Sequence, residues 1–157
     1  MFEMKNVKNK VQALSDYLTQ SEKVQPAISS VSVGWHIEHS LLVIKQITST
    51  VAQSDPALFK QQFNFKRFCV FFLNFFPRGK AQAPKVVLPS IELNHQALEE
   101  SIKHTYQALD YLKDCQTNQY FMHPIFGQLN KNQTIRFLAI HTNHHLKIIK
   151  EILSQAK

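Results

Sequence analysis

The sequence predicts an all-α fold, a four-helix bundle in which a long crossover linker joins the second and third helices. Three observations support this prediction. Four long stretches carry apolar residues at the three- and four-residue spacing of amphipathic helices. Only three Gly and six Pro interrupt the 157 residues, which leaves room for long helices. No stretch has the apolar–polar alternation of a convincing strand. We expect residues 1–157 to form a single domain.

The composition and the charge limit the class of protein. Hydrophobic residues make up 44% and charged residues 18% of the chain, which is typical of a globular protein and argues against a disordered one. The net charge of +7 would suit nucleic acid, but Lys and Arg are spread along the chain and no nucleic-acid-binding motif is present. We therefore expect no nucleic-acid partner, while an acidic small molecule is compatible with this charge.

The cysteines and the first residues indicate the compartment. Cys69 and Cys115 are too few and too far apart for a disulfide framework, which favours a reducing compartment. Residues 1–10 mix charged and apolar side chains, unlike a secretion signal. The longest apolar run, residues 68–76, is too short to cross a bilayer. We expect a cytoplasmic protein without a membrane partner.

The first predicted helix covers residues 2–20, and a connection containing Pro26 follows it. Ser29, Ser30 or Ser32 is a suitable N-cap for the next helix. The apolar residues of the first helix, at helical spacing, are Phe2, Val7, Val11, Leu14, Tyr17 and Leu18.

The second predicted helix covers residues 31–53, and its apolar half carries both His36 and His39, about 60° apart around the helix. Periodicity alone does not choose between these two histidines. A polar stripe favours His39, because polar residues within an apolar half would suit a wet or metal-lined cavity. The alternative is that this stripe faces solvent. Glu38 lies about 100° from His39 and is expected to point to solvent. The stripe consists of Ser32, His39, Gln46 and Thr50.

Residues 54–92 are the least regular part of the chain and contain a cluster of Phe residues. We interpret this cluster as a lid over one end of the bundle or as a partner interface. Membrane-surface binding is the alternative, because Arg78 and Lys80 follow the cluster. The predicted order here is a short helix over about 65–76, a turn at 77–80 and an extended segment at 81–89.

The third predicted helix covers residues 94–113, with Asn94 as its N-cap. A connection over residues 116–128 follows it. Asn130 and Gln133 then resemble a capping box in their side-chain chemistry. This places the start of the last helix near Lys131.

Histidines in the last helix are the strongest functional signal. His141 and His145 fall one turn apart inside its apolar arc, and His144 falls at the edge. A buried imidazole without a partner costs on the order of a few kcal/mol, and an H-x-x-x-H pair suits one metal ion. The alternative is that both rings are core residues bonded to a carbonyl or a water. His95 and His104 lie in polar surroundings and are expected at the surface.

A helical bundle would bring His39 to His141 and His145, and we predict that these three residues hold a divalent metal ion. Three neutral imidazoles leave positions open for water or substrate. Such an ion lowers the pKa of water or activates a thiol. Imidazole ligands suit zinc, nickel, copper or iron. No catalytic residue is assigned, and the residues whose roles stay open are His36, Glu38, Gln46, His123 and His144.

Three patches of the sequence resemble the DinB/YfiT-like family of metal-dependent enzymes. Residues 123–129 read H-P-I-F-G-Q-L and residues 141–145 read H-T-N-H-H. They match a branch with H-P-x-F-G-x-L before a helix containing H-x-x-H-H. Trp35 precedes His39 by four residues, as a Trp precedes the family's first metal ligand. The P-R-G-K and A-P-K stretches within residues 77–85 resemble the middle linker of that branch.

The resemblance implies a four-helix bundle, often dimeric, in which three histidines hold a nickel or zinc ion. Here these are His39, His141 and His145. Characterised relatives include thiol S-transferases and hydrolases. The resemblance therefore implies a homodimeric metal-dependent hydrolase or thiol S-transferase that acts on a small-molecule substrate, with a thiol cosubstrate in the transferase case. The alternative is a non-catalytic helical bundle that binds a metal or a ligand.

Overall fold

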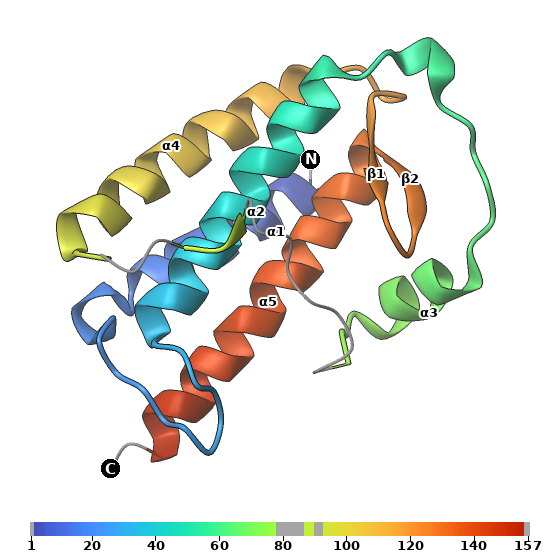
Figure 1. Ribbon diagram of the computed structural model, residues 1–157. Coiled ribbons are helices and arrows are strands. Elements are labelled where there is room, and N and C mark those ends of the chain that lie inside the picture. The colour runs from blue at the N-terminus through green and yellow to red at the C-terminus, as the bar shows by residue number, and fades with distance from the viewer. Residues whose placement is uncertain (1, 78–86, 90–92, 156–157) are drawn as a thin grey trace.

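A computed structural model describes residues 2–77, 87–89 and 93–155 of the chain (Figure 1). This part of the chain is mostly helical, as predicted, and it contains one small antiparallel sheet. No helix within it has both the length and the apolar character needed to cross a membrane. The helices are α1 (Phe2–Ser15), α2 (Val33–Gln53), α3 (Phe65–Leu73), α4 (His95–Asp114) and α5 (Lys131–Gln155), and the strands are β1 (Tyr120–His123) and β2 (Gly127–Asn130).

Four long helices enclose the core. Helix α2 packs along both α4 and α5, and α1 packs along α5 and α4 (Figure 1). Each of the four helices contributes large side chains that are fully buried, as expected from their apolar stripes. Since α2 and α5 lie next to each other, side chains from these two helices can share one site. Fully buried members of the core are Val7, Leu14, Ile37, Leu41, Ile44, Leu98, Leu109, Leu112, Leu138, Ile149 and Ile152.

The expectation that the chain has no convincing strand was wrong, because β1 and β2 form a hairpin before the last helix. Phe121 pairs with Leu129 across the two strands, and both side chains are buried. Gly127 has a φ of 71°, which a residue without a Cβ adopts at no steric cost. Each strand has only four residues, which is too short for apolar–polar alternation to stand out in a sequence.

Side chains cap the helices where the sequence predicts caps. The Ser32 hydroxyl accepts a hydrogen bond from the Trp35 amide at 3.2 Å, and the Asn94 side chain accepts one from Ala97 at 2.8 Å. Asn130 and Gln133 bond each other's backbone amides at 3.0 and 3.2 Å, a reciprocal capping box. The starts of α2, α4 and α5 are therefore set by local chemistry.

Two predicted helices end earlier than expected. The helix predicted over residues 2–20 ends at Ser15, and a short 3₁₀ turn follows at Leu18–Gln20. The helix predicted over residues 65–76 ends at Leu73, because Asn74 takes the left-handed conformation with a φ of 49°, which Asn tolerates better than most residues. Residues 78–86, which hold most of the turn and extended segment predicted there, lie outside the described part of the chain.

Candidate metal centre

Three histidines from two helices converge inside the molecule. His39 comes from α2, and His141 and His145 come from α5. One ring nitrogen of each residue lies within 4.8 Å of the corresponding nitrogens of the other two. The ring centroids of His39 and of His141 both lie 4.7 Å from that of His145. The three residues proposed from the sequence thus form one cluster that can hold a metal ion.

Aromatic rings one helical turn earlier support two of these histidines. The indole of Trp35 stacks on the His39 ring with centroids 4.9 Å apart. Phe137 stacks on His141 in the same manner, with centroids 5.9 Å apart. Residues four apart lie on the same face of a helix, so the sequence spacing itself places each aromatic ring against its histidine. Phe76, which follows α3, adds an edge-on contact to His141.

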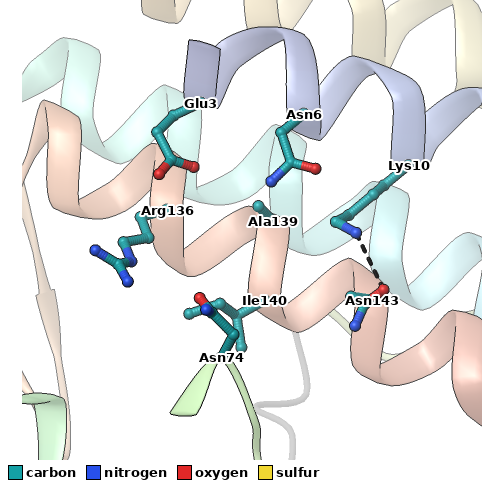
Figure 2. A pocket seen from close by; sticks show the side chains of 8 residues that line it. All are labelled: Glu3, Asn6, Lys10, Asn74, Arg136, Ala139, Ile140 and Asn143. Atoms are coloured by element: carbon teal, nitrogen blue, oxygen red, sulfur yellow. Dashed lines mark hydrogen bonds between the residues drawn. The ribbon is translucent and has the colours of Figure 1, made fainter. Parts of the chain in front are cut away.

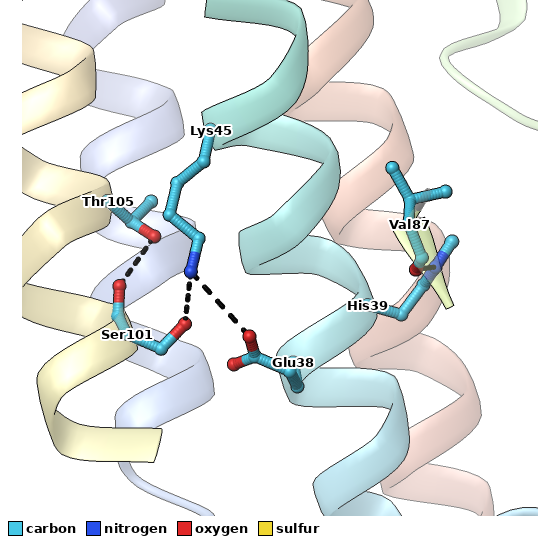
Figure 3. A network of polar contacts seen from close by, with 6 residues as sticks. All are labelled: Glu38, His39, Lys45, Val87, Ser101 and Thr105. Atoms are coloured by element: carbon cyan, nitrogen blue, oxygen red, sulfur yellow. Dashed lines mark hydrogen bonds and ion pairs between the residues drawn. The ribbon is translucent and has the colours of Figure 1, made fainter. Parts of the chain in front are cut away.

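A backbone carbonyl fixes the orientation of His39. Nδ1 of His39 lies 2.8 Å from the carbonyl oxygen of Val87, in the linker between α3 and α4 (Figure 3). A carbonyl only accepts hydrogen bonds, so Nδ1 must carry the proton. The lone pair of a neutral His39 is consequently on Nε2, free to bind a metal ion.

A fourth histidine lies directly behind the cluster. Nδ1 of His36 lies 3.0 Å from Nδ1 of His145, and Nε2 of His36 lies 3.0 Å from the Ser29 hydroxyl. Both histidines are buried. The sequence alone did not choose between His36 and His39. The structure places His39 in the cluster, and it places His36 against Nδ1 of His145.

His141 has a buried ring nitrogen that lacks a hydrogen-bond partner within the described part of the chain. Its Nδ1 is buried and has no hydrogen-bond partner among the residues that the structure describes. Leaving a buried polar atom unpaired costs about 1–3 kcal/mol. Neither the backbone nor a described side chain offsets this cost, whereas a metal ion bound at Nδ1 would. This observation therefore fits a metal ion better than a set of ordinary core histidines.

The surroundings keep the three imidazoles neutral. Burial lowers the pKa of His39, and it lowers the pKa of His141 and of His145 well below the usual value. The neighbouring histidines lower the pKa of His141 and His145 further, because protonating one ring disfavours a charge on the next. Neutral imidazole is the form that binds metal ions, so the cluster is ready to bind one at neutral pH.

The other candidate residues lie elsewhere. The expectation that Glu38 points to solvent was wrong: its side chain is only 13% exposed and pairs with Lys45, which also donates to Ser101 on α4 (Figure 3). Lys45 attracts the carboxylate toward α4, away from His39. Gln46 and Thr50 are exposed, so His39 is the only buried residue of the predicted polar stripe.

The remaining histidines have local roles or lie at the surface. Nδ1 of His123 accepts hydrogen bonds from the amides of Ile125 and Phe126, at 3.1 and 3.2 Å, and thereby shapes the hairpin turn. His144 contacts Phe76 and His145 with its ring. His95 and His104 are exposed, as predicted. Because Nδ1 of His123 is bonded to backbone amides of the hairpin turn, we assign His123 no role in the three-histidine cluster.

A separate polar pocket lies on another side of α5. It has a volume of about 90 Å³ and lies between α1, α5 and the end of α3 (Figure 2). Lys10 and Asn143 face each other there, with a hydrogen bond of 3.0 Å. This pocket faces α1 rather than α2, so it is distinct from the three-histidine cluster. Its lining is Glu3, Asn6, Lys10, Asn74, Arg136, Ala139, Ile140 and Asn143.

Sequence reasoning missed the partners that hold the cluster in place. The bond from His36 to His145 joins positions 109 residues apart, and no local pattern indicates it. Val87 lies in a linker without periodicity, so its carbonyl could not be assigned to His39 in advance. The i, i+4 spacing of Phe137 and His141, like that of Trp35 and His39, is a signal that can identify a supporting ring.

Comparison with known proteins gives a family and no activity. A family model described as a protein of unknown function (DUF1569) matches residues 3–152. No curated protein and no solved structure matches the chain.

Proposed function

Because the chain belongs to the DUF1569 family, which has no assigned function, we propose a function from its site: His39, His141 and His145 bind a divalent metal ion, and the chain is a metal-dependent enzyme. The observation that carries the proposal is the convergence of three neutral imidazoles within 4.8 Å. The unpaired Nδ1 of His141 supports it, because a buried nitrogen there needs a partner.

The spacing of the three rings fits a metal ion after small adjustments. A tetrahedral ion with bonds of about 2.0–2.1 Å to nitrogen holds its ligand atoms roughly 3.4 Å apart. The nitrogens here lie within 4.8 Å of one another, so modest movements of the side chains suffice to bring them together. Such movements are ordinary for side chains on packed helices when a ligand binds.

Hydrogen bonds to the outer nitrogens would set the proton positions. Val87 holds the proton of His39 on Nδ1. With His145 ligating through Nε2, its Nδ1 carries a proton and donates to Nδ1 of His36. Nε2 of His36 then carries the other proton and faces the Ser29 hydroxyl. Partners of this kind orient ligand histidines and make them more basic.

The proposed reaction class is hydrolysis or transfer to a thiol. A divalent ion held by three histidines supplies Lewis acidity, which makes water or a thiol a stronger nucleophile near neutral pH. Zinc and nickel are the metals we propose, since both accept imidazole ligands. A cavity of about 320 Å³, lined in part by Trp35 and Ser32, could hold a small molecule beside the ring that stacks on His39, although none of the three histidines lines it.

We also propose that the chain is a DinB/YfiT-like four-helix bundle of α1, α2, α4 and α5, and that it is a homodimer. The packing of these four helices around one core supports the first part. The homodimer is supported only by the three sequence patches that resemble the DinB/YfiT-like family. Sedimentation analysis of the purified protein tests the homodimer, and a monomer at micromolar concentration would contradict it.

Metal analysis of the purified protein tests metal binding. After incubation with zinc or nickel and removal of the excess, we expect about one ion per chain in the wild type. His39→Ala, His141→Ala and His145→Ala should each lose most of the bound metal. His104→Ala is the matched control, because this histidine is exposed on α4. Equal metal content in all five proteins would contradict the proposal.

Activity assays test the enzymatic part separately. Metal-loaded protein should hydrolyse activated esters or transfer a thiol to an electrophile, and His141→Ala should lose this activity. Retained metal without either activity would contradict the proposed reaction class and favour the alternative, a non-catalytic bundle that binds metal.

A further inference from the structure

The exposed face of α3 has no counterpart elsewhere on the described surface. Phe65, Phe68 and Phe72 lie within about 60° of one another around the helix, and their exposed fractions are 68, 54 and 74%. Phe63, just before α3, is 79% exposed. We call these four residues the Phe surface. Large contiguous apolar surfaces are rare on monomeric proteins and mark sites of interaction.

The opposite face of α3 is fastened to the rest of the molecule. The Arg67 guanidinium donates to the carbonyls of Phe126 and Gln128 at 3.3 and 3.2 Å. The Arg136 guanidinium, from α5, donates to the Phe71 carbonyl at 2.6 Å. Helix α3 therefore cannot roll to bury the Phe surface without breaking charged hydrogen bonds, which are the stronger kind. The outward orientation of the Phe surface is part of the fold.

The stretch of sequence that contains the Phe surface carries only basic charges. The sequence has no Asp or Glu between Asp55 and Glu92. Lys60 and Lys66 are exposed beside the Phe residues, and the Lys147 ammonium lies 5.9 Å from the ring centroid of Phe75. The basic residues of this stretch are Lys60, Lys66, Arg67, Arg78, Lys80 and Lys85.

We propose that the Phe surface binds an anionic lipid surface, with the Phe rings at the level of the head groups and the lysines against the lipid charges. A short amphipathic helix with aromatic residues and flanking lysines has the chemistry of an interfacial helix. A second copy of this chain fits poorly, because two such faces would bring lysines against lysines without any acidic partner from residues 56–91.

This proposal departs from the sequence-based interpretation of a lid or a partner interface and from the expectation of no membrane partner. It takes up the alternative, binding to a membrane surface. Only part of the Phe cluster packs on the core, namely Phe71 and Phe76. Lipid binding by the Phe surface does not depend on metal binding, so the failure of one of these two proposals leaves the other intact. The proposed binding is to the surface of a bilayer and involves no crossing.

Vesicle flotation with the full chain tests the proposal. The wild type should float with vesicles made of equal parts phosphatidylglycerol and phosphatidylcholine, less with phosphatidylcholine alone, and less at high salt. The variant Phe65→Gln/Phe68→Gln/Phe72→Gln should bind the anionic vesicles at least about tenfold more weakly, because it removes three apolar rings. The control Val24→Gln/Tyr111→Gln changes exposed apolar residues elsewhere and should bind like the wild type.

Charge variants keep the test decisive if the Phe variant does not fold. Lys60→Gln and Lys66→Gln leave every Phe in place and should each weaken anionic-vesicle binding by up to about fivefold. Absence of wild-type binding to anionic vesicles would overturn the proposal. Binding of anionic vesicles that is equal in the wild type and in all the Phe and Lys variants would also overturn the proposal. Self-association that disappears in the Phe variant, without vesicle binding, would assign the surface to a second copy instead.

Discussion

The nitrogens Nδ1 of His36 and Nδ1 of His145 lie 3.0 Å apart, and two such atoms can bond only if one of them carries a proton and the other does not. If His145 binds metal through Nε2, the shared proton belongs to His145. His36 is then an acceptor toward His145 and a donor toward Ser29. The residue that the sequence left undecided thus gains a role in positioning a metal ligand.

We predict that His36→Phe weakens metal binding about 10- to 100-fold while leaving the three ligands in place, which is the usual effect of losing an outer partner of a ligand histidine. The measurement is competition with a chelator of known affinity. His95→Phe, at an exposed position on α4, is the control. An unchanged affinity in His36→Phe would show that the contact between the two histidines does not support the site.

His123 gives a prediction about pH and stability. Burial lowers its pKa from 6.5 to about 4, and its Nδ1 already accepts two backbone hydrogen bonds. The unfolded chain takes up this proton as pH falls below 6.5, whereas the folded chain resists it until about pH 4. The free energy of unfolding should therefore decrease as pH falls through this window and be unaffected by His123 above it.

His123→Asn should reduce that pH dependence. An Asn side-chain oxygen can accept the same backbone hydrogen bonds without titrating. Urea unfolding at a series of pH values should show a slope that is smaller in the variant by up to about one proton between roughly pH 6 and pH 4. Identical slopes in the two proteins would mean that His123 titrates normally in the folded chain.

At the scale of elements, α5 matters most, because it carries two of the three clustered histidines and begins at a reciprocal capping box. Asn130 and Gln133 satisfy amides at its first turn. Asn130→Ala should lower the free energy of unfolding by about 1 kcal/mol. Asn132→Ala, exposed one residue into the helix, should change it much less. Urea denaturation of both variants measures this difference. Equal free energies of unfolding in the two variants would show that the Asn130 cap does not stabilise α5.

For the whole molecule, metal binding should appear as stability. A ligand that binds only the folded chain stabilises it by about 2.7 kcal/mol at a concentration 100 times its dissociation constant. Zinc or nickel should therefore raise the thermal midpoint of the wild type. It should not raise that of His39→Ala/His141→Ala. A shift of the same size in both proteins would mean that the ions bind elsewhere.

Much of this architecture could be read from the sequence, because long amphipathic helices leave a strong periodic signal. The caps at Asn94 and Asn130 are local, so the sequence revealed them too, and Ser32 is one of the three serines it offered as the cap of α2. The cluster was accessible because two of its histidines share one helix at i, i+4 spacing. The hairpin was missed, since four-residue strands carry little pattern. The orientation of Glu38 was missed because it depends on Lys45 and on the packing of α4 against α2.

The most direct test of the central claim is anomalous diffraction from crystals grown with zinc or nickel. We predict one strong peak between α2 and α5, with nitrogens of His39, His141 and His145 about 2.0–2.1 Å from it, and no peak in crystals of His141→Ala. The account would be contradicted if no peak appeared there and the three rings were instead bonded to backbone or water.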